Sequence, residues 1–481
     1  MVNEKFIKDK IILIEFNELC PTLLDRWMAQ GHLLNFKKFY DSSHIFLTTP
    51  CVPEQENLEP WIQWYSMHTG LAYDQHKVFH LTDGPRATHP DIWSVLSGSD
   101  ISVGNCGSMN ARGYDIAGSY FLPDPWCDTE LCSPKELQAY YEFVSFLVRE
   151  YSNSNAKLSR SVYTRFVTFM LSHGLGLSTI TAIAKQLVHE RTLDRKHSWK
   201  RVAIQDKLQF DVFAHYQKKL KPQFATFFTN STAHLQHAYW RNMEPQKFDA
   251  QPTESDQRLY SDAILFGYEM MDSLLGRFVD MVSEDTMLIF TTALSQQPFL
   301  KDENVGGQKF YRLKIVNGFL KALEISFINV QPVMTHQFKV RFENTDQLNT
   351  ACAMLEQVTC HGQPVFNCNQ AENNSLNIGC PFHHTIDADS HLQFGRKNES
   401  LKFFDEFYLI DATKSGYHHP DGALWIQYGG SHKHQDKVSV LDVFPTVLDF
   451  FNVTTPQPEN NVYRGTSLLP TLVSTEHGKA A

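Results

Sequence analysis

A short apolar run stands near each end of this chain, and each run leads into a segment with helical spacing. Ile11–Phe16 has the continuous apolar pattern of a strand buried on both faces, and Pro21–Ala29 follows as a helix. The same order recurs where Gly422–Tyr428 precedes Val440–Phe451. Strands that alternate with helices pair side by side in one sheet. The pattern therefore predicts an α/β fold, with a mostly parallel sheet sandwiched by helices.

The middle of the chain interrupts this core twice. Residues 1–129, 221–307 and 411–481 are expected to form the core, with a long helix over Ser255–Val282. Residues 130–220 are expected to form a helical cap insertion. Its three segments of helical spacing are Lys135–Tyr151, Ser161–Leu171 and Thr179–Arg191.

Residues 308–410 form the second interruption, a smaller mixed α/β insertion. A helix over Thr345–Gln357 is expected between strands at Phe338–Phe342 and Pro364–Asn367. The segment Asn369–Asp389 is expected to be a polar loop.

Charge and cysteine usage narrow the class of protein. The net charge of −10 is spread along the chain, which excludes the basic footprint of a nucleic-acid-binding protein. No window reaches the roughly 20 apolar residues of a membrane span. The nine cysteines include no Cys-x-x-Cys pair and fit reduced thiols. We expect a cytoplasmic protein that acts on a small molecule, and its oligomeric state stays open.

Two pairs of segments carry a resemblance to a known family. The first is Lys10–Leu24 with Trp64–His76, and the second is Tyr417–Ile426 with Val438–Phe451. Together they resemble the alkaline phosphatase superfamily, in its type I phosphodiesterase/nucleotide pyrophosphatase and sulfatase branch. The resemblance implies an alkaline-phosphatase-like core. It also implies a hydrolase in which two metal ions, often zinc, flank a Thr, Ser or modified Cys nucleophile.

The sequence departs from that family at most of its functional positions. Pro60 stands where the resemblance places the nucleophile, and it has no nucleophilic group. Of the family's metal ligands, His237 and His418 remain. The other ligand positions hold Asn17, Ala233, Ala293 and Leu294. This divergent active site argues against an ordinary two-metal hydrolase.

The remaining polar residues near the strand ends are candidates for the chemistry. Imidazoles titrate near neutral pH, so two histidine pairs are candidate acid/base groups together with Glu59 and Glu15. These pairs are His234/His237 and His418/His419. Other candidates are polar or aromatic groups expected to bind substrate: Asn17, Trp61, Gln63, Trp64, Ser295, Gln296 and His419.

The segment Thr48–Trp64 combines Glu54, Glu56 and Glu59 with Trp61 and Trp64. Rings that stack and acids that accept hydroxyl groups suit a sugar. The alternative is a solvated acidic loop with two packing tryptophans.

Three functional hypotheses follow. The first is a divergent phosphodiesterase- or sulfatase-like enzyme that works without metal, and without another cofactor, on a small phosphorylated, sulfated or glycosyl substrate. The second is a catalytically silent binding or regulatory protein that retains the pocket. The third is a residual one-metal hydrolase in which His237, His418 and a carboxylate bind zinc or manganese.

Carboxyl ends of parallel strands meet at one edge of a sheet, so a single cavity there is expected to collect the principal candidates. They are Glu15, Asn17, Glu59, His234, His237, Ser295 and His418.

Overall fold

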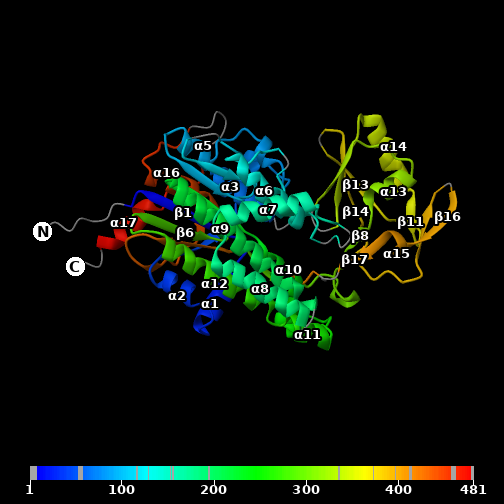
Figure 1. Ribbon diagram of the computed structural model, residues 1–481, viewed down its shortest axis with the longest axis horizontal. Coiled ribbons are helices and arrows are strands. Elements are labelled where there is room, and N and C mark those ends of the chain that lie inside the picture. Colours follow the sequence, from blue (N-terminus) through cyan, green and yellow to red (C-terminus); the bar gives the residue numbers. More distant parts are fainter. Residues whose placement is uncertain are drawn as a thin grey trace.

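The computed structural model separates a large α/β part from a smaller part built on residues 308–410 (Figure 1). It describes residues 8–52, 58–114, 117–127, 129–151, 153, 156–192, 195–333, 336–371, 373–395, 397–410, 414–456 and 462–477. Among these residues, no helix combines the length and apolar character that crossing a membrane requires.

The large part is built on a nine-stranded sheet among the described residues. Its order is β20-β2-β19-β6-β1-β5-β3-β4, with β21 paired to β2. Most neighbours run parallel, and β19 lies antiparallel to both β2 and β6. The strands are β1 (Lys10–Phe16), β2 (His44–Thr49), β3 (Val103–Cys106), β4 (Tyr120–Leu122), β5 (Phe224–Thr229), β6 (Thr286–Thr291), β19 (Gly422–Gln427), β20 (His432–Lys433) and β21 (Val438–Ser439). This confirms the predicted fold class.

Strand β1 lies inside the sheet, and its sequence reflects burial on both faces. Ile12, Ile14 and Phe16 pack into the core on one side, and Ile11 and Leu13 pack into the core on the other. Successive side chains of a strand alternate between faces, so a strand covered on both sides needs an unbroken apolar run.

Helices cover both faces of the sheet (Figure 1). One layer contains α1 (Pro21–Ala29), α2 (Leu34–Asp41), α9 (Val202–Leu220) and α12 (Ala263–Met281). The other contains α3 (Pro60–Thr69), α5 (Ile92–Ser97), α16 (Val443–Phe450) and α17 (Leu469–His477).

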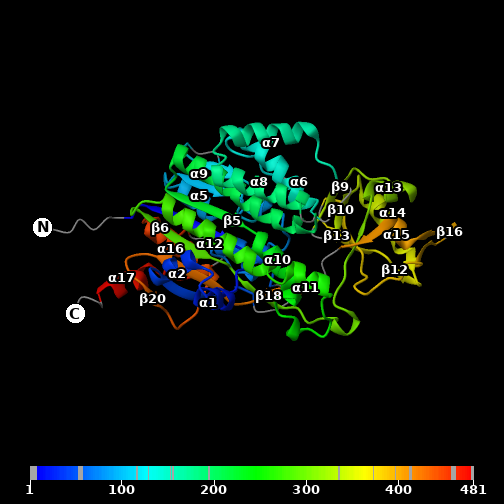
Figure 2. The ribbon, with the colours of Figure 1, turned by 60° about the horizontal axis from the view of Figure 1, so that its bottom comes forward.

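The predicted cap helices are present with ends displaced by up to three residues. They are α6 (Gln138–Arg149), α7 (Arg160–Ser172) and α8 (Leu177–Thr192). Tyr140, Phe166 and Phe169 anchor α6 and α7 on the apolar core that α1, α2, α9 and α12 form with the sheet. Figure 2 shows α7 running along the outer edge of the molecule.

Two predicted elements are wrong. The single helix expected over Ser255–Val282 is two helices, α11 (Glu254–Tyr260) and α12, separated at Ser261 and Asp262. Serine and aspartate compete for backbone hydrogen bonds and favour helix ends over helix interiors.

The expected polar loop Asn369–Asp389 contains the end of β13 (Asn367–Ala371) and all of β14 (Ser375–Gly379). Leu376 and Ile378 are completely buried there. In the sequence, the polar residues between and around Leu376 and Ile378 hide the alternation of apolar and polar positions that marks a strand.

The smaller part has its own apolar core. Its two four-stranded sheets have the orders β13-β14-β10-β9 and β12-β11-β15-β16. The elements are β8 (Tyr311–Leu313), α13 (Val316–Ala322), β9 (Asn329–Pro332), β10 (Phe338–Arg341), α14 (Thr345–Glu356), β11 (Val358–Cys360), β12 (Gln363–Pro364), β15 (His391–Phe394), β16 (Lys397–Lys402), α15 (Phe403–Glu406) and β17 (Phe407–Leu409). The predicted strand at Phe338–Phe342 and helix at Thr345–Gln357 are present as β10 and α14, but the strand expected at Pro364–Asn367 is wrong, because β12 ends at Pro364 and β13 begins at Asn367. The five-segment division of the chain stays a prediction.

Candidate active site

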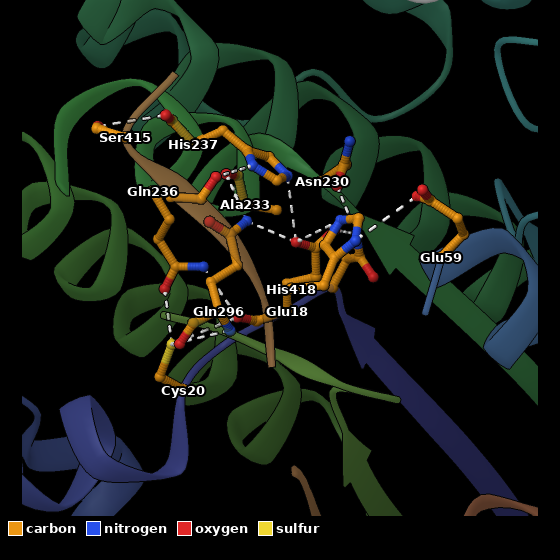
Figure 3. Close-up of polar contacts among 12 residues, drawn as sticks. Glu18, Cys20, Glu59, Asn230, Ala233, Gln236, His237, Gln296, Ser415 and His418 are labelled. Carbon is orange, nitrogen blue, oxygen red and sulfur yellow. Dashed lines mark hydrogen bonds and ion pairs between the residues drawn. The ribbon is translucent and has the colours of Figure 1, made fainter. Parts of the chain in front are cut away.

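Polar side chains from four separate segments meet beyond the carboxyl ends of β1, β5 and β6. Glu18 follows β1, and His237 lies on α10 (Ser231–Met243) after β5. Gln296 lies on β7 (Ser295–Pro298) after β6, and His418 lies on β18 (Gly416–His419), which pairs antiparallel with β7. Figure 3 shows these four side chains directed toward one another. The parallel part of the sheet thus places the site where open α/β sheets bind their ligands.

Glu18 is the centre of this group. Its backbone has a φ of 61°, in the left-handed region that residues other than glycine rarely adopt. The carboxylate is almost completely buried. Oε1 accepts a hydrogen bond of 2.7 Å from Asn17 Nδ2, and Oε2 accepts one of 2.5 Å from Gln296 Nε2. Two amide donors therefore fix the orientation of the carboxylate.

Two imidazoles face this carboxylate. His237 Nε2 lies 3.3 Å and His418 Nε2 lies 3.6 Å from Glu18 Oε2. The ring centroids are 5.3 Å apart, and the ring planes meet at 78°. His237 Nδ1 lies 2.9 Å from the carbonyl oxygen of Gly416, so Nδ1 carries a proton and donates it. Nε2 is then the nitrogen available to a ligand.

The three side chains fit a divalent metal ion. One ligand atom from each of Glu18, His237 and His418 lies within 4.8 Å of the others. In the described part of the chain, no other set of three His, Cys, Asp or Glu side chains meets this geometry. Two imidazoles and a carboxylate suit zinc and leave a fourth position open. The bond from His237 Nδ1 to a backbone carbonyl is typical of the outer shell of such sites.

Electrostatics hold these groups in the form that binds metal. Burial opposes ionisation of Glu18, but electrostatic attraction to the neighbouring His418 and His237 and the hydrogen bond from Gln296 lower its pKa to about 2. Burial lowers the pKa of His418 to about 4, although the charge of Glu18 opposes this. Near neutral pH the site therefore presents an ionised carboxylate and a neutral His418 imidazole.

Glu59 and Lys414 are two further charged side chains near the cluster. Glu59 Oε2 is 3.6 Å from His418 Nδ1, and burial raises the pKa of Glu59 to about 7. Lys414 Nζ lies 4.9 Å from the ring centroid of Phe299 and 4.6 Å from that of Tyr417. Burial lowers the pKa of Lys414, while Glu59 and Glu18 attract its charge. The site thus combines a carboxyl group that exchanges its proton near neutral pH with a cation.

Buried hydrogen bonds hold Asn17 and Cys20, which lie next to the cluster. Asn17 Oδ1 accepts from the indole N–H of Trp64, and Asn17 Nδ2 also donates to Asn230 Oδ1, both at 2.7 Å. The Cys20 amide N–H donates to the Tyr268 hydroxyl at 2.6 Å. Burial raises the pKa of Cys20 to about 12, so the thiol is unreactive and fills space beside Gln296.

The structure brings together five of the residues singled out from the sequence. Asn17, Gln296 and Glu59 lie around His237 and His418. Their catalytic and binding roles stay predictions.

Glu15 does not join them. It is buried on β1, and its Oε1 lies 2.7 Å from His68 Nε2. Glu18 therefore occupies the place expected for a carboxylate on this strand end. Side chains alternate along β1, so Glu15 lies on the same face of the sheet as Ile11 and Leu13. Glu18 lies in the turn after the strand.

The other candidates have their partners outside the cluster of Glu18, His237 and His418. Trp64 is completely buried, and Trp61 Nε1 donates to the Phe79 carbonyl at 2.7 Å. Gln63 Oε1 accepts from the Cys51 amide at 3.0 Å. His234 packs edge-on against Tyr151, and burial lowers its pKa to about 4.

Two further candidates form hydrogen bonds with the backbone of Asp421. Ser295 Oγ donates to the Asp421 carbonyl at 2.6 Å, and His419 Nδ1 accepts from the Asp421 amide at 3.1 Å. Glu54 and Glu56 lie outside the described residues.

Sequence reasoning missed Glu18, Lys414 and Asn230 as parts of the site. The only sequence signal for Glu18 was its position next to Asn17 at the end of the first strand. Choosing Glu18 over Glu15 requires the structure, in which Glu15 pairs with His68 and Glu18 faces His237. Lys414 and Asn230 lie in irregular segments, and no motif marks them.

Comparison with known proteins places the chain in no described family. No protein-family model matches it, and the curated proteins give no match. Among solved structures, phosphonoacetate hydrolase from Sinorhizobium meliloti 1021 is similar at 10% identity, with 93% of this chain and 96% of that chain covered and a TM-score of 0.40.

Murine ectonucleotide pyrophosphatase/phosphodiesterase 5 is similar at 10% identity, covering 94% of this chain and 98% of that one with a TM-score of 0.38. The human counterpart gives 8% identity, 94% and 97% coverage and a TM-score of 0.38. Similarity this low transfers no residue's role. The resemblance to the alkaline phosphatase superfamily stays a prediction, and the site is argued from its own geometry.

Proposed function

We propose that the protein is a hydrolase that holds one divalent ion, zinc or manganese, on Glu18, His237 and His418 and cleaves a small phosphorylated or sulfated molecule. The observation that carries the proposal is the convergence of one carboxylate and two imidazoles within 4.8 Å. Among the three hypotheses from the sequence, this cluster supports the one-metal hydrolase.

The surrounding side chains suit that role. A divalent ion at such a site polarises an ester oxygen and lowers the pKa of a bound water molecule. Asn17 and Gln296 hold the Glu18 carboxylate with its lone pairs directed at the site, and Gly416 fixes the His237 tautomer. Such outer contacts are what set ligand orientation and affinity.

Glu59 is the proposed general acid/base. Its pKa of about 7 allows the carboxyl group to take a proton from an attacking water and return it to the leaving group. Pro60 offers no nucleophilic side chain, so we expect direct attack by water and no covalent intermediate. Lys414 supplies a positive charge that interacts with Glu59 and Glu18, which favours an anionic substrate over a neutral sugar.

Metal binding tests the centre first. The protein is stripped with a chelator, and zinc and manganese are titrated by calorimetry into wild type, Glu18→Gln and His237→Ala. We expect one ion per chain in wild type and greatly weakened binding in both variants. His391→Ala, at an exposed histidine, is the control and should bind as wild type does. Equal metal binding by wild type and His237→Ala would overturn the centre.

Activity tests the reaction. The metal-loaded protein is assayed on nitrophenyl phosphate monoesters and diesters and on a nitrophenyl sulfate. On any substrate that is turned over, Glu59→Gln should lower kcat by about 10²- to 10⁴-fold, the range for general acid/base groups. Tight binding of one ion with no turnover of any ester in this series would instead mark a binding protein.

A further inference from the structure

A cavity opens between three helices of the large part. Helix α8 packs against α9 and against the short helix η4 (Arg195–Arg201), and α9 packs against α12 (Figure 2). The cavity between them has a volume of about 260 Å³ and shares no lining residue with the candidate active site. Pockets for drug-sized molecules measure roughly 300–1,000 Å³, so this volume suits a smaller molecule. We call it the α8–α9 cavity.

The lining of the α8–α9 cavity combines apolar and basic side chains. The principal apolar residues are Ala203, Ile204, Phe266 and Met270. The basic residues are Lys185, His189, Lys200 and Lys207, which come from α8, η4 and α9. No Asp or Glu is present among the described residues that line the cavity. An apolar lining with a few convergent polar groups is typical of small-molecule sites, and here the polar groups favour an anion.

Two of the basic side chains are placed to contact a ligand. Lys200 Nζ lies 5.2 Å from the ring centroid of Trp199 and 5.3 Å from that of Phe266, so its ammonium group lies against aromatic rings. His189 Nε2 is buried and has no hydrogen-bond partner among the described residues. A buried polar atom without a partner destabilises the fold, and a bound polar group would remove this cost.

Carboxylates act on Lys207, but they have partners of their own. Asp211 Oδ1 accepts from Arg277 Nη2 at 2.6 Å, and Asp206 accepts from two hydroxyl groups. Burial and the charge of Arg277 lower the pKa of Lys207. The charges of Asp211 and Asp206 oppose this decrease without reversing it. An anionic group in the cavity would therefore further favour the charged form of Lys207.

We infer that the α8–α9 cavity binds a small organic anion, with an apolar body and one carboxylate, sulfonate or phosphate group. The apolar body contacts Phe266 and Met270. The anionic group lies among Lys200, Lys207 and His189, where ammonium and imidazole N–H groups donate hydrogen bonds to it. Binding in this cavity does not depend on the proposed hydrolase activity.

Equilibrium dialysis with 2-naphthoate tests the inference. This probe joins an apolar ring system to one carboxylate, and 2-naphthalenemethanol is its uncharged counterpart. The full chain is first stripped with a chelator, so that the carboxylate cannot bind an ion held by Glu18, His237 and His418. We expect one bound 2-naphthoate per chain and about tenfold or more weaker binding of the alcohol, because hydrogen bonds between charged groups are the stronger ones. High salt should weaken binding of the anion.

A first variant fills the cavity without changing its charge. Ala182 lines the cavity on α8, whereas Ala184 on the same helix is exposed and does not line it. We expect Ala182→Trp to lose measurable binding of 2-naphthoate, because the indole occupies the space of the ligand. Ala184→Trp adds the same side chain outside the cavity and should bind as wild type does.

A second variant removes charge and keeps hydrogen-bonding groups. Lys200→Gln with Lys207→Gln should weaken the binding of 2-naphthoate about tenfold or more and leave the weaker binding of the alcohol unchanged. Lys218→Gln with Lys321→Gln, at two exposed lysines outside the cavity, is the matched control and should have no effect on either ligand.

Circular dichroism and thermal unfolding check that each variant is folded. Absence of 2-naphthoate binding by wild type would overturn the inference. Equal affinity for the anion and the alcohol would also contradict it, because the basic side chains would then contribute nothing. Undiminished binding by Ala182→Trp, or equal losses in the control variants, would place the ligand elsewhere on the chain.

Discussion

His237 Nε2 lies 3.3 Å from Glu18 Oε2, while Nδ1 of the same ring donates to the Gly416 carbonyl at 2.9 Å. With Nδ1 protonated, a neutral His237 directs a lone pair at a carboxylate oxygen. Two such acceptors repel each other unless a proton or a cation lies between them. His418 Nε2 approaches the same oxygen at 3.6 Å. The arrangement is thus suited to bind a positive centre, and this relationship underlies the first prediction.

Gln296→Leu should weaken zinc binding by about 10- to 100-fold, the usual effect of removing an outer-shell contact. The substitution removes the 2.5 Å bond to Glu18 Oε2 and frees the carboxylate to turn. Gln297→Leu is the matched control, because Gln297 Nε2 donates to the His418 carbonyl and not to the carboxylate. Competition with a chelating dye measures both affinities. Similar losses in the two variants would contradict the assignment.

The second prediction concerns the buried pair of Glu15 and His68. Replacing either by Leu should lower the free energy of unfolding by about 3–5 kcal/mol, because one charge or polar ring is left buried without its partner. The double variant should recover part of this loss. Glu15 Oε2 and His68 Nδ1 have no hydrogen-bond partner among the described residues, so removing both side chains leaves no other hydrogen-bonding group of the protein without a partner. Urea unfolding measures stability.

Metal binding separates this pair from the candidate active site. We expect the double variant of Glu15 and His68 to bind zinc as wild type does, since neither residue belongs to the Glu18 cluster. A loss of metal affinity as large as that of Glu18→Gln would show that Glu15 acts on the site.

The fold was predictable from the sequence because the central strands have an unambiguous pattern. β1 is longer than expected by one residue, and β19 ends one residue earlier than expected. Burial on both faces demands apolar residues at successive positions, which few other structures require. The break between α11 and α12 was missed because apolar spacing continues across Ser261 and Asp262.

The site was harder to predict because it depends on backbone conformation and on packing between distant segments. His237 and His418 were found through the resemblance, but their carboxylate partner was not. The rule that ligands bind beyond the carboxyl ends of parallel strands points to positions 17 and 18 equally. Glu18 has a left-handed backbone, and its carboxylate lies within 3.6 Å of both histidines. Trp64 was expected at a sugar site, yet its indole lies in the core and donates to Asn17.

The third prediction is that residues 308–410 fold alone. Their described apolar residues form a separate core, which includes Val340, Leu355 and Leu392. Strands β8 and β17 pair antiparallel, so the two ends of the segment lie side by side. The isolated fragment should show a cooperative thermal transition, and Val340→Asp, at a completely buried position, should abolish it. A wild-type fragment without a transition would show that this part requires the core.

The fourth prediction is that stability falls below neutral pH partly through His76. Burial lowers the pKa of His76 to about 3, well below its usual value of 6.5. Its Nδ1 accepts from the Val78 amide at 2.9 Å, and Nε2 lies 2.8 Å from Ser66 Oγ, so the folded state holds the neutral ring. Protonation would remove the acceptor at Nδ1.

The sign of the pH dependence follows from the two pKa values. Above pH 6.5 the ring is neutral in both the folded and unfolded chains, and its full contribution to stability is present. As the pH falls from 6.5 toward 3, the unfolded chain binds a proton that the folded chain excludes, and stability declines. Between pH 7.5 and pH 5 this one group should remove about 2 kcal/mol from the free energy of unfolding.

Urea unfolding of wild type and His76→Gln at the two pH values isolates this contribution. Other buried histidines titrate in both proteins, so the difference between their pH dependences belongs to His76. The variant should be less stable than wild type at pH 7.5, and the gap should narrow by about 2 kcal/mol at pH 5. His391→Gln, at an exposed ring, should follow wild type at both pH values. A gap that stays constant with pH would show that the folded chain accepts the proton at His76.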